Sequence, residues 1–324
     1  MKSRHCFNKL AASNAGRSLR PRSMVSKTLA VFFLVIAASS NASADIVIQG
    51  FDANANDRFA NNPLFVLNGT NLSGVGLTNG GGFNGVVGIW ATLISPNVVI
   101  AANHNRPTAG PISFYPNNNP LSTPFTYSVV NSQRIGTTDL WLGQLNAPVD
   151  ASISYYAFAT EFLSGPAPNP NPNLVAAGTV QGENGYVFGV SPTVRVPTQD
   201  VAVGRNIITG YIEDIFAPDI NSTLDLLFLN RDASNPAGYE AVVQPGDSGA
   251  PFFIERNGSP FLLGVNSVLF GAVQNPTATG VSYLGNEALA IQAFINNSAV
   301  PEPNTFVLLG FAGALLVWQR LRTS

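Results

Sequence analysis

The stretch Pro245-Gly246-Asp247-Ser248-Gly249-Ala250-Pro251 is a short turn that leads into the apolar run 252–254. Glycine adopts backbone angles that other residues avoid, so the glycines on either side of the serine permit a tight turn. Such a turn exposes the Ser248 hydroxyl, and the amides of Gly246 and Ser248 can face one point beside it. Two converging N–H groups stabilise a negatively charged oxygen. We therefore predict that Ser248 is a nucleophile and that Gly246 and Ser248 form an oxyanion hole.

A serine hydroxyl needs a neighbouring base, and His104 is the only histidine outside the basic N-terminal leader. It follows the predicted strand Val98–Ala102, which ends in small residues. An imidazole that acts as a base needs a carboxylate to fix its tautomer. Asp139 stands at the head of the predicted strand Leu140–Leu145. The sequence therefore predicts a catalytic group of His104, Asp139 and Ser248.

Short apolar runs, often β-branched, alternate with Gly, Asn and Pro throughout residues 45–299. This spacing is typical of strands in barrels or sandwiches. The predicted strands are Val86–Ile94, Val98–Ala102, Leu140–Leu145, Tyr186–Val190, Leu226–Leu229, Pro251–Ile254 and Phe261–Val265. The Pro- and Asn-rich stretch 164–173 cannot hold regular structure, because each proline removes a backbone donor and restricts the residue before it. It divides the body into halves at 45–163 and 174–299, and the second half ends in a predicted short helix over 287–296.

The chain has 324 residues, of which 10% are charged, against about 25% in an ordinary soluble domain. Residues 45–299 contain no lysine, seven arginines and 17 acidic residues, which gives a net charge of −10. Nucleic-acid binding requires a basic surface, so we expect no DNA or RNA partner. With 45% apolar residues, the chain has enough apolar side chains for a hydrophobic core.

The first 44 residues are typical of a secretory signal peptide. They carry seven basic residues and no acid, followed by the apolar run 29–38 and by Ala42-Ser43-Ala44. This order predicts cleavage before Asp45, and a translation start at Met24 is a further hypothesis. The alternative is an N-terminal membrane anchor, although the apolar run is short for a bilayer span.

Removal of the leader would leave a chain without cysteine, because Cys6 is the only one. Disulfides, thiolate catalysis and cysteine-based zinc sites are then excluded. One histidine without cysteine does not supply the usual ligands of a transition metal. We expect no metal and no cofactor, with a calcium site among the acids from Asp214 to Asp225 as the alternative.

The last 25 residues begin with Val300-Pro301-Glu302-Pro303, continue with the apolar stretch 305–318 and end with Arg320 and Arg322 near the terminus. The prolines end any helix that comes from the body, the apolar stretch can enter a membrane, and the arginines stay on its cytoplasmic side. This segment, 300–324, resembles the PEP-CTERM sorting signal. The resemblance implies a Gram-negative bacterium, export to the cell surface or the medium, transient membrane contact through 305–318 and processing by an exosortase-type sorting enzyme. A plain membrane anchor and a buried helix are the alternatives.

Residues 86–297 resemble the chymotrypsin/trypsin-like serine endopeptidases. Gly246-Asp-Ser-Gly-Ala-Pro251 matches the family's Gly-Asp-Ser-Gly-Gly-Pro at five of six positions, and Ala-Ala-Asn-His104 is similar to its Ala-Ala-His. The resemblance implies an all-β fold of two six-stranded antiparallel β-barrels with a short C-terminal helix. It also implies that Ser248 attacks a peptide carbonyl, that His104 transfers the proton and that Asp139 orients His104. The expected partner is then a polypeptide substrate.

Several residues depart from the family's pattern. Asn103 stands between the two alanines and His104, and Asn105 replaces a cysteine. Val242, six residues before Ser248, replaces the acid that attracts Lys or Arg, and Val268 follows Ser267 of the strand that pairs with substrate. We therefore predict substrate binding at Val242, Ser267 and Val268. Small or apolar residues should be preferred over basic residues at the cleavage site.

In animal members of the family, a newly cut Ile amino terminus pairs with the acid before the serine, here Asp247. Cleavage of the leader would instead expose Asp45, so we expect Asp247 to bind another donor and no activation switch of that type.

We expect an exported serine endopeptidase that acts through an acyl-enzyme. The alternative is a noncatalytic surface or exopolysaccharide-matrix protein that uses the same barrels as a binding scaffold. The predicted site residues have alternative interpretations as well. The alternatives are an ordinary β-turn at 246–249, a surface role for His104, and Asp150 or Asp200 in place of Asp139.

Overall fold

The computed structural model describes residues 45–78, 89–107, 110–119, 121–163, 180–195, 198–232, 238–273 and 275–298. The predicted signal peptide, the linker at 164–173 and the predicted sorting segment at 300–324 lie outside these ranges. All described residues belong to one unit of the chain. Within them, no helix has the length and apolar character needed to cross a membrane.

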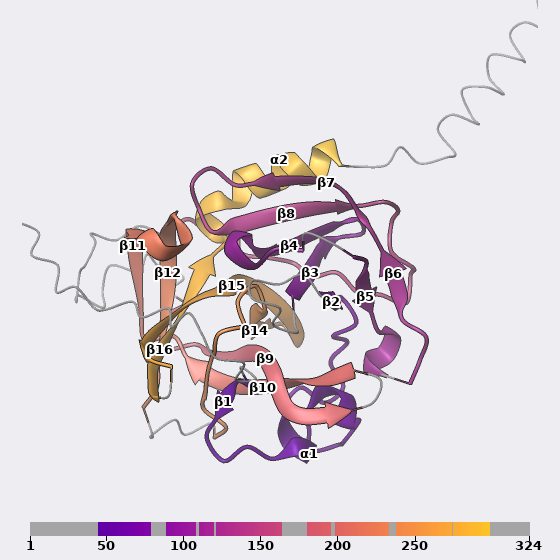
Figure 1. Ribbon diagram of the computed structural model, residues 1–324, viewed down its shortest axis with the longest axis vertical. Coiled ribbons are helices and arrows are strands. Elements are labelled where there is room, and N and C mark those ends of the chain that lie inside the picture. The colour runs from indigo at the N-terminus through magenta and orange to yellow at the C-terminus, as the bar shows by residue number, and fades with distance from the viewer. Residues whose placement is uncertain are drawn as a thin grey trace, which may run out of the picture. The chain divides into compact units, whose positions relative to one another are not determined.

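Two antiparallel sheets of seven strands each form most of the structure (Figure 1). The first sheet consists of β2 (Val75–Thr78), β3 (Ile89–Ser95), β4 (Val98–Ala102), β5 (Ile112–Phe114), β6 (Phe125–Tyr127), β7 (Val129–Arg134) and β8 (Leu140–Leu145). The second sheet consists of β9 (Asn184–Arg195), β10 (Thr198–Ile207), β11 (Gly210–Ala217), β12 (Ser222–Asn230), β14 (Pro251–Arg256), β15 (Ser259–Ala272) and β16 (Asn275–Tyr283). A separate pair joins β1 (Val47–Ile48) to β13 (Ala241–Val242).

Helices in the described residues are short. They are α1 (Ala53–Asn56), α2 (Ala288–Asn297) and the 3₁₀ turns η1 (Arg58–Ala60), η3 (Asn103–Asn105), η4 (Pro116–Asn118), η6 (Pro218–Ile220) and η7 (Gly285–Glu287). The predicted helix over 287–296 corresponds to α2. Each predicted strand lies within an observed strand wherever the structure describes it, with residues 86–88 outside the described ranges.

Each sheet is a barrel that one bent strand closes. In the first sheet β6 and β7 lie at opposite ends of the strand order, although only Ser128 separates them in the chain. In the second sheet β10 and β11 lie at opposite ends, and only Ile208 and Thr209 separate them. The Ile208 amide donates to Glu183 and the Thr209 amide to Phe228, so the bend joins both edges. Each barrel therefore has six strands, one of them divided in two, which confirms the predicted fold class.

The largest buried cluster contains residues of both barrels. Trp90 comes from the first barrel, and Phe188 and Phe253 come from the second. The ring of Phe253 lies edge-on to Tyr156 at 4.8 Å and to Phe188 at 5.5 Å between centroids. Burying a side chain of this kind stabilises a protein by about 1.5–3 kcal/mol. The cluster therefore holds the two barrels against each other.

Helix α2 follows the second barrel in sequence but lies beside β7 and β8 of the first barrel (Figure 1). Its side chains Ile291 and Phe294 are buried in the cluster between the barrels. The carbonyl of Ser298, directly after the helix, accepts hydrogen bonds from Asn97 at 2.6 Å and Gln144 at 3.2 Å. The end of the described chain is thus fixed to the first barrel.

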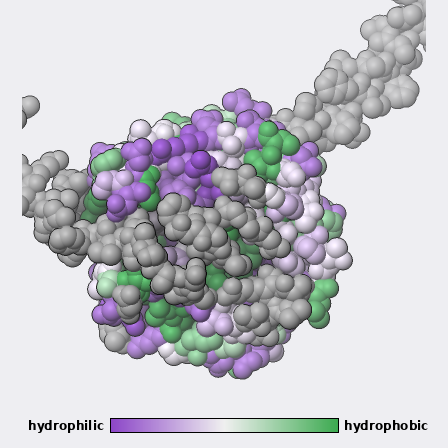
Figure 2. All heavy atoms as spheres, viewed as in Figure 1, coloured by the Kyte–Doolittle hydropathy of each residue, from purple (hydrophilic) through white to green (hydrophobic). Residues whose placement is uncertain are grey.

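The face shown in Figure 2 mixes hydrophilic and hydrophobic residues in small areas among the described residues. Because only 10% of the chain is charged, uncharged polar residues, asparagine in particular, supply much of the hydrophilic surface.

Candidate active site

Strand pairing places His104 beside Asp139. Ala102 at the end of β4 pairs with Leu140 at the start of β8. The contact continues one residue further, because the Asn103 amide donates to the Asp139 carbonyl at 2.8 Å. His104 follows in η3. The antiparallel register therefore brings the imidazole to the carboxylate across 35 residues of sequence.

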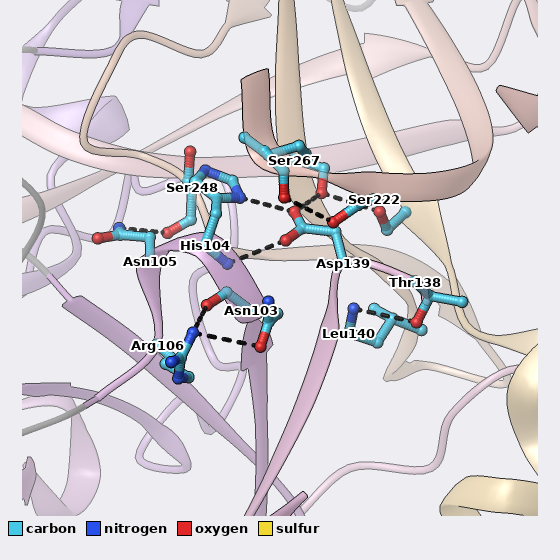
Figure 3. A network of polar contacts seen from close by, with 12 residues as sticks. Asn103, His104, Asn105, Arg106, Thr138, Asp139, Leu140, Ser222, Ser248 and Ser267 are labelled. Carbon is cyan, nitrogen blue, oxygen red and sulfur yellow. Dashed lines mark hydrogen bonds and ion pairs between the residues drawn. The ribbon is translucent and has the colours of Figure 1, made fainter. Parts of the chain in front are cut away.

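The carboxylate of Asp139 is completely buried and accepts three hydrogen bonds (Figure 3). The His104 amide donates to Oδ1 at 3.0 Å, His104 Nδ1 lies 2.7 Å from Oδ2, and the Ser267 hydroxyl also donates to Oδ2. The Ser282 hydroxyl in turn donates to Ser267 at 2.8 Å. An ionised carboxylate only accepts, so the hydrogen of the neutral imidazole is on Nδ1. Nε2 is then free to accept a proton.

The turn that carries Ser248 lies between β13 and β14. The Asp247 amide donates to the Gln244 carbonyl at 3.0 Å, with Pro245 and Gly246 at the centre of the turn. Proline fixes its φ near −65° and Gly246 has a φ of 109°, which together define a type II turn. Among the described residues the amides of Gly246 and Ser248 donate to no protein group. Both N–H groups are therefore available to a ligand.

Three contacts from the first barrel position this turn. Trp90 Nε1 donates to the Gly246 carbonyl at 3.2 Å, and Asn105 Nδ2 donates to the Ser248 carbonyl at 2.8 Å. Gly249, at a φ of 88°, lies so close to β4 that an added methyl group would be 3.1 Å from the backbone nitrogen of Ala102. The serine turn of the second barrel is thus packed directly on the strand that leads to His104.

Figure 3 shows the imidazole of His104 between Asp139 on one side and Ser248 on the other. The imidazole is 21% exposed and Ser248 is partly exposed. Within the described residues no hydrogen bond joins the Ser248 hydroxyl to His104. Contacts between a nucleophile and its base are often long before substrate binds. The structure therefore brings the three predicted catalytic residues to one place, with the serine hydroxyl unbonded.

The three residues predicted to bind substrate lie in different surroundings. Val242 is 1% exposed in β13. Val268 is buried against Leu224 and Leu226 of β12. Ser267 directs its hydroxyl to Asp139, but it is also the unpaired residue of a bulge in β15. A bulge leaves the backbone of the extra residue outside the ladder.

The alternative acids occupy other parts of the structure. Asp150 accepts hydrogen bonds from the amide and hydroxyl of Ser152 at 2.9 and 2.7 Å, and these bonds lower the pKa of its carboxyl. Asp200 lies in β10 and accepts the Phe59 amide at 3.0 Å. Asp139 is the acid that contacts His104.

Of the acids considered for calcium, Asp225 binds protein groups with both carboxylate oxygens. One oxygen of Asp225 accepts the Asp214 amide at 3.0 Å, and the other accepts Asn286 Nδ2 at 2.6 Å. In the ranges that the structure describes, no three His, Cys, Asp or Glu residues are grouped as a metal site would require.

Sequence reasoning missed the polar partners of the site. The bond from Asn105 to Ser248 has no signal in the sequence, because it depends on how the barrels pack. A second example is Arg134 of β7, which donates to the carbonyls of Thr138 and Asn221 at 2.8 Å each and to Ser222 Oγ at 2.9 Å. This arginine ties the tip of the β11–β12 hairpin to the loop before Asp139.

Asp247 is buried beneath the serine turn. Its carboxylate accepts the Val190 amide at 2.7 Å and the Gln244 amide at 2.8 Å, which are the other donors that the sequence analysis expected. Burial raises the pKa of this carboxyl well above its ordinary value; the two hydrogen bonds oppose the shift and nearby Asp45 adds to it. Ile46 lies close by, and its amide donates to the Val190 carbonyl at 2.9 Å.

No model of a protein family and no curated protein matches the chain. Among solved structures, it is similar to the inactive form of the Rv3671c protease, at 21% identity and a TM-score of 0.42 over 67% of this chain and 87% of that one. A mutant of human heparin binding protein has 15% identity and a TM-score of 0.48 over 72% and 95% of the chains. The NS6 protease of murine norovirus 1 has 15% identity and a TM-score of 0.39 over 67% and 93%. The fold described above rests on the strand pairing of this chain itself.

The raised pKa of Asp247 makes stability depend on pH. At a pH between the unfolded and the folded pKa of this carboxyl, folding takes up a proton. The stability that the carboxyl contributes is therefore full below its unfolded pKa and is lost as pH rises through its folded pKa. We expect the free energy of unfolding of the wild type to fall relative to that of Asp247→Asn as pH increases from about 4. Urea unfolding of both proteins over a pH series measures this difference. A difference that stays constant with pH would contradict the expectation.

Proposed function

We propose that this protein is a serine endopeptidase in which Ser248 is the nucleophile, His104 the general base and Asp139 the residue that orients the base. The observation that carries the proposal is the 2.7 Å contact between His104 Nδ1 and the buried Asp139 carboxylate, beside Ser248. This contact leaves Nε2 free on the side of the ring where Ser248 lies (Figure 3). A partly exposed hydroxyl and two unused amides complete the groups that acyl transfer needs.

The reaction follows from these positions. Ser248 Oγ attacks the carbonyl carbon of the peptide bond, and its proton moves to Nε2 of His104. The carbonyl oxygen becomes negative and accepts hydrogen bonds from the Gly246 and Ser248 amides. His104 then protonates the leaving amine, the C–N bond breaks and an ester to Ser248 remains. Water attacks this ester through the same base, which releases the acid product and restores the hydroxyl.

Asp139 supports the imidazolium that forms in both steps. Its burial keeps water from competing for the carboxylate, which strengthens the attraction between the two charges. The Ser267 hydroxyl holds Oδ2 from the second barrel. Beyond Asn266, β15 pairs only with β16 among the described strands, so its other edge from Ser267 onward is a position at which an extended peptide can add.

The first test is covalent labelling with a fluorophosphonate probe. We expect modification of the wild type at Ser248, no labelling of Ser248→Ala, and a loss of kcat of about 10⁶-fold in that variant. Asp139→Asn should keep the fold and lower kcat by about 10⁴-fold, because the imidazole then takes the wrong tautomer. Ser259→Ala, at an exposed serine of β15, is the matched control and should label like the wild type. Failure of the folded wild type to label would favour the noncatalytic scaffold.

The second test concerns specificity. Position 242 holds a valine and not an acid, so it offers no charge to attract Lys or Arg. We therefore expect kcat/KM for peptides with Ala, Val or Leu before the cleaved bond to exceed that for Lys or Arg by about 10- to 100-fold. A set of peptides that differ only at this residue gives the ratio. Preferred cleavage after basic residues would disprove the proposed preference.

We also propose that the protein is exported and processed at both ends, by signal cleavage before Asp45 and by an exosortase-type enzyme near Pro301, with transient membrane contact through 305–318. In support, the residues next to both proposed cuts are held by the barrels: the Ile46 amide donates to the Val190 carbonyl at 2.9 Å, and the Ser298 carbonyl accepts from Asn97 at 2.6 Å. Both cuts would leave these contacts in place. Mass spectrometry of protein from the culture medium and the cell surface should find a product that starts at Asp45 and lacks the last apolar segment. Recovery of only the uncut chain from both fractions would contradict the proposed processing, and absence of the protein from both would contradict export.

A further inference from the structure

Asn105 links the turn that carries the base to the backbone of the nucleophile. It follows His104 in η3, and its Nδ2 donates to the Ser248 carbonyl at 2.8 Å (Figure 3). His104 belongs to the first barrel and Ser248 to the second. A single hydrogen bond between neighbours of the two catalytic groups therefore spans the boundary between the barrels.

This bond fixes one side of a peptide unit whose other side is fixed by the second barrel. The Ser248 carbonyl and the Gly249 amide belong to the same peptide, and the Gly249 amide donates to the Asn266 carbonyl at 2.8 Å. Asn266 is itself anchored, because its Nδ2 donates to the Phe188 carbonyl at 2.9 Å. With both edges held, the peptide after Ser248 cannot rotate without breaking a hydrogen bond.

The other end of the link is also rigid. The η3 turn is held by the Asn103 amide on the Asp139 carbonyl and by the His104 amide on Asp139 Oδ1. Asn105 is only 9% exposed, so water competes little with its hydrogen bond to Ser248. The distance between the imidazole and the serine hydroxyl thus depends on a short chain of fixed groups.

We propose that Asn105 is a positioning residue that sets the approach of His104 to Ser248, an inference that rests on the proposed function. Its amide supplies the donor that the Ser248 carbonyl needs from the first barrel. Catalysis by proton transfer is sensitive to such alignment, since a misplacement of about 1 Å costs on the order of 100-fold in rate. Removing the donor loosens the Ser248 backbone without altering the predicted substrate contacts at Val242, Ser267 and Val268.

The test compares Asn105→Leu with Asn97→Leu. Leucine has the branched shape of asparagine but neither a hydrogen-bond donor nor an acceptor. Asn97 is the matched control, because it is 6% exposed against 9% for Asn105, and its Nδ2 also donates to a backbone carbonyl, that of Ser298, at 2.6 Å. It lies in the β3–β4 turn, at the opposite end of β4 from His104. Each variant loses one hydrogen bond from a side-chain amide to a backbone carbonyl, but only Asn105→Leu loses it at Ser248.

We expect Asn105→Leu to lower the rate of fluorophosphonate labelling and kcat by about 10- to 100-fold, with KM within about threefold of the wild type. Asn97→Leu should keep the wild-type labelling rate, although urea unfolding shows a comparable loss of stability. Asn105→Ala repeats the comparison if the leucine variant does not fold.

Three results would overturn the inference. They are a wild-type labelling rate in folded Asn105→Leu, an equal loss of rate in Asn97→Leu, and failure of both Asn105 variants to fold while Asn97→Leu folds. In the first two cases a wild type that labels at Ser248 leaves the proposed protease function standing. A wild type that never labels refutes that function, and the role of Asn105 with it.

Discussion

A carboxylate that is fully removed from water needs hydrogen-bond donors, and this need organises the site around Asp139. The donors come from both barrels, because His104 belongs to the first and Ser267 to the second. The charge is therefore satisfied only when the barrels are together. Association of the two halves and orientation of the imidazole are consequences of the same set of contacts. A site between two barrels can in this way remain precise without any covalent link across it.

Much of this arrangement is predictable from the sequence, because it follows from local patterns. Apolar runs predict the strands, and the ends of β4 and β8 place His104 and Asp139 where paired strands meet. The glycines around Ser248 predict the turn. The division of one strand of each barrel into two is harder to predict from the sequence. Ser128, for example, is an ordinary residue whose place at the bend between β6 and β7 follows only from closure of the whole barrel.

The remaining parts of the site depend on side-chain directions after the barrels have packed. The sequence suggests Ser267 as a substrate contact, and only the fold shows its hydroxyl on Asp139. Asn105 is recognisable in the sequence as a replaced cysteine, but its partner is 143 residues away on the other barrel. The contact of Arg134 with the tip of the β11–β12 hairpin is another example. Residues so far apart in the sequence produce no periodic pattern from which their contact could be predicted.

The bent strands that close both barrels have a consequence for behaviour in solution. An open sheet exposes a row of unpaired N–H and C=O groups that can template association with another chain. Here the strands at the two ends of each sheet order are continuous through Ser128 or through Ile208 and Thr209, so each sheet uses its own chain to cover what would be a free edge. The net charge of −10 on residues 45–299 already makes copies of this protein repel one another. Covered edges add a geometric safeguard against aggregation, which does not weaken when salt screens the charges.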